Sequence, residues 1–259
     1  MVRRITVAAG HITLKYHEMV EPHHIDEKGD GSPVTQADHE AEEYIERALR
    51  NLTPDIPVIA EEAIGKGNIP DLGAHDYFWL VDPVDATKEF ISGGDNYTVN
   101  IGLIHKAVPV LGVVYAPALG LLYAGHGETA IRWSEDTDKD KSIRVRSAPA
   151  AGLTVMSSQN HADDARMDKF LQGFKVGKIL KRSSSLKICM VAEGKADMYP
   201  RLGPTSQWDT AAGDAVLRAA GGIVTDIEGK PLVYGRRGKG FENPHFVASS
   251  FEWFDKGES

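Results

Sequence analysis

The chain has 259 residues, of which 42% are hydrophobic and 25% are charged, and its formal net charge is −8. These proportions are ordinary for a globular protein with a sizeable core, and they exclude a mostly disordered chain. The negative balance argues against binding of nucleic acid polymers through a general basic surface.

The single cysteine and the amino-terminal residues indicate in which cellular compartment the protein works. Cys189 has no second cysteine to pair with, and its apolar neighbours predict a buried thiol. The amino-terminal segment starts basic, but polar residues break its apolar run, so it is a poor signal peptide. No apolar run approaches the ~20 residues of a membrane span. We expect a cytoplasmic protein without a transmembrane segment, and this interpretation leaves a peripheral association with the inner membrane open. The sequence indicates no oligomeric state.

The first part of the chain mixes helices and strands. Apolar residues at helical spacing predict helices over about 5–20 and 36–51, separated by a loop over 21–34 that is rich in Gly and Pro. Apolar runs bounded by turn residues predict strands at 58–60, 77–81, 98–105, 109–115, 121–124 and 129–133. The charged residues 134–141 predict a loop.

The second part alternates strands and helices. Strands are predicted at 153–157, 174–180, 196–199, 223–225 and 246–249, and helices at 162–172, 184–192 and 209–220. We therefore predict an α/β protein built of α and β layers. We expect one domain over residues 1–259 with two lobes, an α+β lobe over about 1–148 and an α/β lobe over about 149–259.

The strongest chemical signal is the run Asp82-Pro83-Val84-Asp85-Ala86-Thr87, which follows a predicted buried strand. Proline restricts its own φ and disfavours helix at the preceding residue, so the chain must turn here. A tight turn can bring both carboxylates and the Val84 carbonyl to one point, and such oxygen ligands suit Mg²⁺. The alternative is an ordinary acidic turn.

Two further acidic positions accompany this run. Glu61 and Glu62 end another predicted buried strand, and Asp209 opens a predicted helix, where its ordinary role is that of an N-cap. Carboxylates that converge without cations repel one another, and their pKa values rise. The residues therefore predict metal dependence, provided that the carboxylates converge.

In combination these motifs resemble the inositol monophosphatase superfamily. The matching runs are Ser32-Pro33-Val34-Thr35 with Ala37-Asp38, Ala60-Glu61-Glu62, Asp82-Pro83-Val84-Asp85 with Thr87, and Trp208-Asp209 with Ala211-Ala212-Gly213. Finer features resemble its bacterial 3'(2'),5'-bisphosphate nucleotidase branch, the CysQ type. They are Lys88-Glu89-Phe90-Ile91, Tyr97-Thr98-Val99-Asn100-Ile101, Ser184-Ser185-Leu186-Lys187 and Tyr199-Pro200-Arg201.

The resemblance implies a fold and an activity. The fold would be the sugar-phosphatase-like α-β-α-β-α sandwich. The activity would be hydrolysis of adenosine 3',5'-bisphosphate to AMP and phosphate by a metal-activated water, with two or three Mg²⁺ ions as cofactors and a place in sulfur metabolism. The implied partner is a small phosphate ester.

The resemblance also implies roles for single residues. Glu61, Asp82 and the Val84 carbonyl would hold one Mg²⁺, and Asp82, Asp85 and Asp209 a second, while Glu61 would help hold a third. The implied catalytic residues are Glu61, Thr87 and Asp38. Asp38 would hydrogen-bond the Thr87 hydroxyl, and Thr87 with Glu61 would orient the attacking water.

For the substrate, the backbone amides of Ala86 and Thr87 would receive the phosphate. The nucleotide would lie over 183–187, with Arg201 nearby. The implied substrate-binding set is Glu61, Asp85, Ala86, Thr87, Ser184, Ser185, Lys187, Arg201 and Asp209.

Two positions depart from the family pattern, which usually has glycine at both. Ala86 matters if its backbone needs a positive φ, and we expect instead a helical conformation in which alanine costs little. Ser183 precedes the segment implied to bind the nucleotide.

Two other functions stay open. One is an inositol monophosphatase or another sugar-phosphate phosphatase, although Lys88-Glu89-Phe90 and Tyr199-Pro200-Arg201 favour the nucleotidase. The other, of a different class, is a weakly active nucleotide-binding sensor. A panel of phosphate esters distinguishes a sugar-phosphate phosphatase from the nucleotidase. Phosphate release measured with Mg²⁺ and with EDTA distinguishes the sensor from an enzyme.

Overall fold

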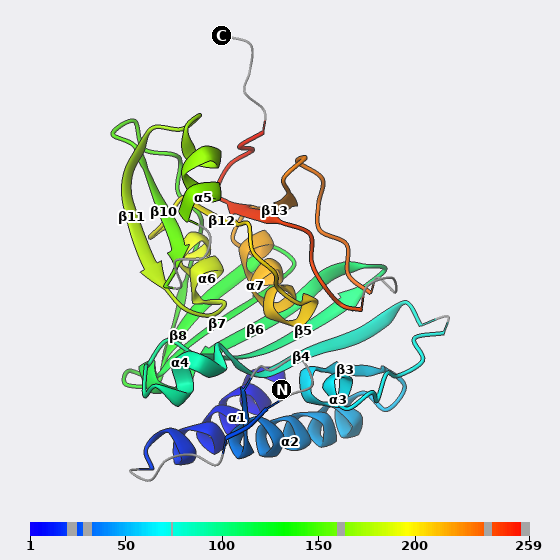
Figure 1. Ribbon diagram of the computed structural model, residues 1–259. Helices are drawn as coiled ribbons and strands as arrows, with labels where there is room; N and C mark the ends of the chain where they lie inside the picture. The colour runs from blue at the N-terminus through cyan, green and yellow to red at the C-terminus, as the bar shows by residue number, and fades with distance from the viewer. Residues whose placement is uncertain (20–24, 28–32, 74, 160–163, 236–239, 255–259) are drawn as a thin grey trace.

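The computed structural model describes residues 1–19, 25–27, 33–73, 75–159, 164–235 and 240–254 (Figure 1). For 25–27, 33–34 and 164 it describes the backbone alone. Ser32 of the first motif and the predicted helix start at 162–163 therefore lie outside the described residues.

A seven-stranded sheet forms the centre of the first half. Its strands, in spatial order, are β3 (Val58–Ala60), β4 (Tyr77–Asp85), β5 (Thr98–His105), β6 (Val108–Ala116), β7 (Leu121–His126), β8 (Thr129–Ser134) and β9 (Lys139–Ser142). β3 pairs parallel with β4, and every other neighbouring pair is antiparallel. The continuous apolar run of β4 reflects burial on both faces of the sheet.

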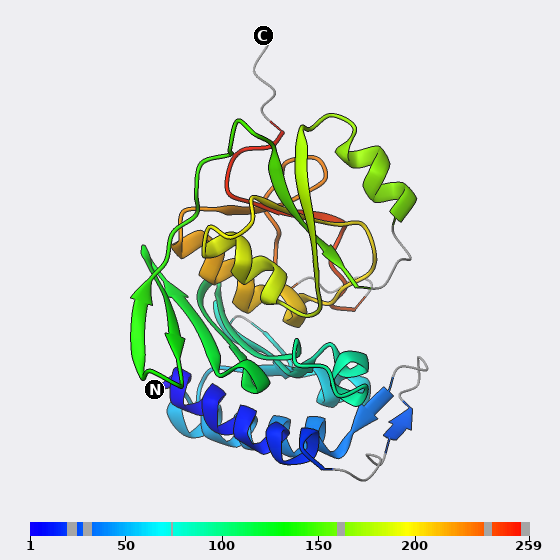
Figure 2. The ribbon, with the colours of Figure 1, turned by 90° about the vertical axis from the view of Figure 1, so that its left-hand side faces the viewer.

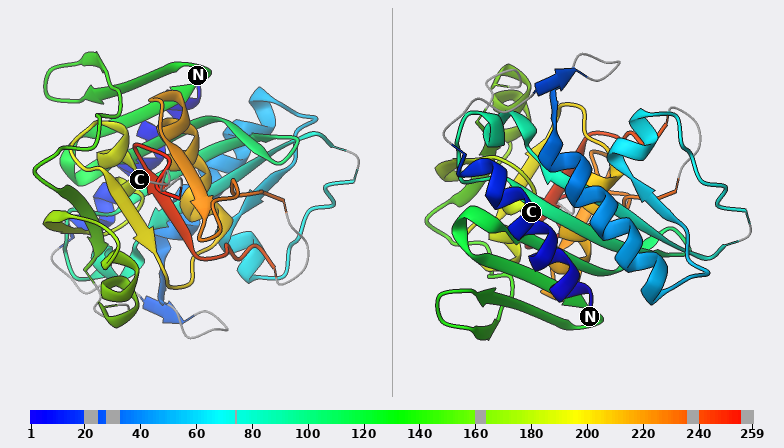
Figure 3. Two further views of the ribbon diagram at one scale, coloured as in Figure 1. Left: turned by 90° about the horizontal axis from the view of Figure 1, so that it is seen from above. Right: turned by 90° about the horizontal axis from the view of Figure 1, so that it is seen from below.

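Two helices cover one face of this sheet, α1 (Val2–His17) and α2 (Gln36–Leu52), which lie side by side in the view from below (Figure 3). Their inner faces bury Ile5, Ala9, Ala41, Ile45 and Leu49 against β3, β4 and β5. α2 begins with a capping box, in which Thr35 and Asp38 each bond the backbone amide of the other. Both helices thus present one apolar stripe to the sheet.

A five-stranded sheet forms the centre of the second half. Its spatial order is β11 (Val176–Arg182), β10 (Leu153–Ser158), β12 (Met198–Arg201), β14 (Phe246–Ser249) and β13 (Ile223–Asp226). β10 runs parallel to both β11 and β12, whereas β14 is antiparallel to β12 and β13. α5 (Asp164–Leu171) packs on its outer face through Met167 and Leu171.

Helices α6 (Leu186–Ala192) and α7 (Gln207–Ala219) lie between the two sheets (Figure 2). The largest buried cluster includes side chains of both helices and both sheets, among them Leu80, Val114, Cys189, Leu217 and Phe246. The layers run α1 and α2, sheet, α6 and α7, sheet, α5, which confirms the predicted α-β-α-β-α sandwich. Cys189 is buried, as predicted.

A row of three glycines lets α7 lie directly on the seven-stranded sheet. Gly102, Gly112 and Gly125 are paired in register on β5, β6 and β7. A Cβ at Gly112 would overlap the carbonyl oxygen of Ala212, and one at Gly125 would lie 2.6 Å from the Cα of Val216. At Gly112 and Gly125 only hydrogen fits, and at Gly102 an added Cβ would lie 3.0 Å from the Cβ of Ala211, so α7 lies directly against β5, β6 and β7.

Some elements differ from the sequence prediction. β4 continues to Asp85 instead of ending at residue 81, and β9 occupies part of the predicted loop 134–141 because its backbone pairs with β8 although its side chains are charged. Within the predicted loop 21–34, β1 (Ile25–Glu27) pairs with β2 (Pro33–Thr35). α6 starts two residues late, since Ser184 has a positive φ of 55° that a helix does not allow.

Three single-turn helices complete the described elements: α3 (Glu61–Gly65), α4 (Thr87–Ile91) and the 3₁₀ turn η1 (Pro117–Leu119). α3 follows β3 directly, and α4 follows β4 after one residue. None of the described helices is long and apolar enough to cross a membrane.

We expect Gly112→Ala to destabilise the protein by about 2–3 kcal/mol, because the added methyl group meets backbone atoms of α7 that cannot move away alone. Chemical unfolding of both proteins measures the difference. Gly65→Ala is the matched control, since no atom lies within 4 Å of its added Cβ. A Gly112→Ala protein as stable as the control would show that α7 does not pack as closely as described.

Candidate metal and substrate site

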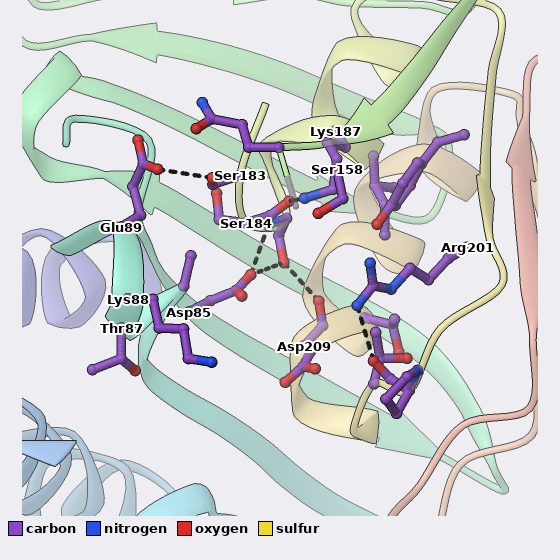
Figure 4. A pocket seen from close by; sticks show the side chains of 18 of the residues that line it. Asp85, Thr87, Lys88, Glu89, Ser158, Ser183, Ser184, Lys187, Arg201 and Asp209 are labelled. Carbon is purple, nitrogen blue, oxygen red and sulfur yellow. Dashed lines mark hydrogen bonds between the residues drawn. The ribbon is translucent and has the colours of Figure 1, made fainter. Parts of the chain in front are cut away.

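A cavity of about 430 Å³ opens between the two sheets, where α4, α6 and α7 begin (Figure 4). Nine of the residues implied by the sequence line it: Glu61, Asp85, Ala86, Thr87, Ser184, Ser185, Lys187, Arg201 and Asp209. Asp82, Val84 and Asp38 are buried and are not part of its lining. The volume is that of a small-molecule site.

A bulge in β4 places its two aspartates on the same side of the sheet. Asp82 pairs with Asn100, and Asp85 pairs with Thr98, so three steps along β4 match two along β5. Asn100 and Thr98 are two residues apart and face the same side, and the extra residue gives Asp82 and Asp85 that same side. Pro83 fits within the bulge because it has no amide proton to donate.

The carboxylate of Asp85 is held by one of its oxygens. Oδ2 lies 2.6 Å from the Ser185 amide, 2.8 Å from the Ser185 hydroxyl and 3.2 Å from Nδ2 of Asn100. Thr98 adds a longer contact of 3.4 Å. With Oδ2 saturated, the orientation of the side chain is fixed, and Oδ1 accepts no hydrogen bond from the described residues.

Ser185 also connects Asp85 to Asp209. Its hydroxyl lies 2.6 Å from the backbone oxygen of Asp209 as well as near Asp85, and its one proton serves either acceptor in turn. Asp209 Oδ2 accepts the Ser206 amide at 2.9 Å, as the third residue of a capping box at the start of α7. Asp209 is therefore not the N-cap of α7: Ser206, three positions earlier, is the cap, and Asp209 is the third residue of the helix.

Burial and mutual repulsion raise the pKa values of two of the carboxylates. Asp82 is 1% exposed, and burial, followed by the charges of Glu61, Asp85 and Asp209, raises its pKa well above the usual range. The pKa of Asp209 is raised by burial, Asp85 and Glu61, against the Ser206 amide and Arg201. Glu61 and Asp82 share a hydrogen bond. The four acidic groups thus converge, as the sequence analysis required.

This donor set fits a hard divalent cation. It consists of carboxylate oxygens together with the nearby Val84 carbonyl, and such ligands suit Mg²⁺. Among the described residues, no three or more His, Cys, Asp or Glu side chains are already arranged around one ion. The proton shared by Glu61 and Asp82 would have to leave for both carboxylates to bind a cation.

The implied contact between Asp38 and Thr87 is not present. Asp38 Oδ2 accepts the amide and hydroxyl of Thr35, while the Thr87 hydroxyl donates to the Val84 carbonyl at 3.1 Å. Asp38 Oδ1 is buried without a partner in the described residues, and burial raises the pKa of Asp38 to about 7. Its capping box at the start of α2 accounts for its present orientation.

The expected helical conformation of Ala86 is wrong. Ala86 is the N-cap of α4 and has φ 74° and ψ 52°, the left-handed region. This conformation lets β4 end in the bulge and α4 begin one residue later. Alanine pays for it with roughly 1–2 kcal/mol of steric strain that glycine would avoid.

Basic side chains also line the cavity. Lys187 is 5% exposed, and its Nζ donates to the Ser184 carbonyl at 2.6 Å and lies 5.2 Å from the centroid of the Tyr199 ring. Burial lowers the pKa of Lys187 to about 8. Arg201 donates to the Pro204 carbonyl and also lines the cavity. The charges of Asp85 and Asp209 oppose the lowering of the Lys187 pKa, so these acidic groups lie within electrostatic reach of it.

Several lining residues were missed from the sequence. Ser158 ends β10 and Gln159 follows it, at the carboxyl end of a strand in a parallel part of the sheet, a position that the predicted strand 153–157 could have indicated. Ser183 belongs to the segment 183–187 implied to contact the nucleotide, and it donates to Glu89 at 3.0 Å and so joins two parts of the cavity lining (Figure 4). Asn100 belongs to the family-like run Tyr97 to Ile101 but was given no role of its own; it donates to Ser185 at 2.9 Å and does not line the cavity.

We expect Ala86→Gly to stabilise the protein by about 0.5–1 kcal/mol, because the relief of strain exceeds the added chain entropy of glycine. Chemical unfolding measures this change. Ala48→Gly, within α2, is the control and should instead destabilise by about 1 kcal/mol. Equal losses in both variants would contradict the left-handed conformation of Ala86.

The sequence of this chain matches the inositol monophosphatase family over residues 2–250. A 3'(2'),5'-bisphosphate nucleotidase CysQ of Escherichia coli O6:H1 is 44% identical over 246 residues, covering 94% of this chain and 96% of that protein. The protein of the same name from Haemophilus influenzae is 33% identical over 256 residues, covering 94% and 90%.

Solved structures agree. CysQ from Bacteroides thetaiotaomicron, a bacterial member of the inositol monophosphatase family, has a TM-score of 0.77 at 35% identity and covers 95% of this chain and 94% of its own. An IMPase from Thermotoga maritima has a TM-score of 0.77 at 23% identity, covering 98% and 92%, and shows the shared fold. The chain belongs to the inositol monophosphatase family.

Proposed function

We propose that this protein is a Mg²⁺-dependent 3'(2'),5'-bisphosphate nucleotidase that hydrolyses adenosine 3',5'-bisphosphate to AMP and phosphate. One observation carries the proposal: the same cavity is lined by Glu61, Asp85 and Asp209, which suit cations, and by Lys187 and Arg201, which suit phosphate. A substrate with two phosphate groups matches both kinds of group. Relatives named for this activity, up to 44% identical over 94% of the chain, support it.

The proposed metal ligands are Glu61, Asp82, Asp85, Asp209 and the Val84 carbonyl, for two or three ions. The convergence of the four carboxylates supports this assignment, because cations would offset the repulsion that raises their pKa values. When bound, Mg²⁺ lowers the pKa of a water molecule and stabilises negative charge on phosphate oxygens.

The remaining steps belong to side chains and amides of this chain. Thr87 and Glu61 would orient the attacking water, and the amides of Ala86 and Thr87 would hold the phosphate that is cleaved. A link from Asp38 to Thr87 requires that the Thr87 hydroxyl leave the Val84 carbonyl. The unpartnered, buried Oδ1 of Asp38 supports such a rearrangement.

The nucleotide would lie in the part of the cavity that Lys187 and Arg201 line. Ser184, Ser185, Lys187 and Arg201 would contact it there, with the second phosphate on the two cations. The cavity takes its lining from both halves of the chain, which supports the proposal of one domain over 1–259 with lobes over about 1–148 and 149–259.

A panel of phosphate esters tests the function directly. We expect the fastest Mg²⁺-dependent phosphate release from adenosine 3',5'-bisphosphate, slower release from inositol 1-phosphate and sugar phosphates, and none with EDTA. Assay of free phosphate under steady-state conditions measures this order. Faster turnover of inositol 1-phosphate would favour the sugar-phosphate alternative.

The same assay tests the metal site through Asp82→Asn, which removes one charge at a buried position and should abolish turnover while leaving a folded protein. Asp76→Asn is the control at the other end of β4, where the side chain is exposed and lies 3.8 Å from Lys106. Normal turnover by Asp82→Asn would disprove the ligand assignment.

We expect the KM for adenosine 3',5'-bisphosphate to rise as the pH rises through about 8, where Lys187 loses its charge. The slope is up to about tenfold per pH unit, because protonated Lys187 binds the anion and neutral Lys187 does not. Steady-state kinetics from pH 6 to 10 measure it. In Lys187→Met the KM should be high at every pH without this rise. An unchanged pH profile in that variant would contradict the role of Lys187.

A further inference from the structure

Glu42 is a buried acidic residue that no step described so far uses. It lies on the inner face of α2, one turn after Asp38, and is 6% exposed. Its two carboxylate oxygens accept the backbone amides of Glu62 and Ala63, each at 2.7 Å. α2 and α3 lie side by side in Figure 1 and in the right panel of Figure 3.

These two amides belong to the turn that begins at Glu61. The first amides of a helix have no partner within the helix, and they are usually satisfied by the side chain of the N-cap residue. The N-cap of α3 is Ala60, whose side chain cannot accept a hydrogen bond, and no cap bond from a side chain is present there. Glu42 therefore takes this role from a different helix.

We propose that Glu42 is a positioning residue for the metal site, in that its carboxylate fixes the backbone from which Glu61 reaches the cation. The proposal rests on the metal-binding role proposed for Glu61. Glu62 and Ala63 directly follow Glu61, so a shift of this turn moves the Glu61 carboxylate. Mg²⁺ demands near-ideal octahedral geometry and tolerates such shifts poorly.

The chemistry of the contact requires a carboxylate. Two amides approach two oxygens, and both positions need an acceptor. Glutamine has the same shape but presents an NH₂ group to one amide, which breaks one bond and places two donors together. Partners outside the first coordination sphere typically change metal affinity by about 10–100-fold when they are altered.

The test compares Glu42→Gln with wild type by calorimetric titration of Mg²⁺ and by the rise in Tm that saturating Mg²⁺ produces. We expect Mg²⁺ to bind about 10–100-fold more weakly to Glu42→Gln, with a smaller rise in Tm. The Mg²⁺ concentration for half-maximal phosphate release should increase in parallel, and higher Mg²⁺ should restore part of kcat. Glu43→Gln, on the exposed side of the same helix, is the control and should match wild type.

A folded Glu42→Gln protein with wild-type Mg²⁺ affinity would overturn the proposal, even if its Tm without metal were lower, since that result indicates a purely structural role. Should Glu42→Gln not fold, Glu42→Asp makes the same test, because it keeps the charge and withdraws both oxygens by one methylene group. Wild-type protein that binds Mg²⁺ but hydrolyses no ester would contradict the proposed function alone. Wild-type protein that binds no Mg²⁺ would overturn both.

Discussion

The close approach of α7 to the seven-stranded sheet is the constraint on which the site depends. The glycines at 102, 112 and 125 leave room for the helix backbone, and the first turn of α7 carries Asp209. Asp85 stands at the end of β4 in that sheet, so the depth at which the helix sits decides the separation of the two carboxylates. Ser185 contacts both residues and so links the end of β4 to the first turn of α7. The contact between the backbones of α7 and the sheet thus sets the distance between Asp85 and Asp209, although neither carboxylate takes part in that contact.

Repulsion between the acidic groups destabilises the folded state, and hydrogen bonds to their carboxylates offset part of this effect. Amides serve Asp82, Asp85 and Asp209, and each of these bonds favours the ionised form of its carboxylate. Burial and the neighbouring charges outweigh them at Asp82 and Asp209, whose pKa values stay raised. The protein therefore fixes the positions of the carboxylates but does not supply enough positive charge to offset their repulsion. A bound cation supplies that charge and stabilises the folded state.

Most of the helices and strands, and most of the residues that line the cavity, could be predicted from local sequence. The run from Asp82 to Thr87 predicted a turn that gathers ligands, and the structure has a β-bulge there, which gathers both aspartates by a different backbone route. Ala86 was misjudged because alanine is small enough to suit a helix, although the glycine that the family usually has at this position pointed to the positive φ that Ala86 adopts. Glu42 could not be recognised, since its two amide partners are 20 and 21 residues away in the chain, and the run that contains Asn100 did not indicate its contact with Ser185, which is 85 residues away.

The glycine row also has a consequence for biosynthesis. The strands that carry the three glycines are complete by residue 126, whereas the helix that covers them spans Gln207–Ala219. A nascent chain on the ribosome therefore presents an uncovered sheet face while more than half of the remaining residues are still being added. Exposed sheet surface of this kind promotes association between unfinished chains. α7 covers this face and also carries Asp209, so the sheet is covered and the last of the four acidic groups arrives with the same helix.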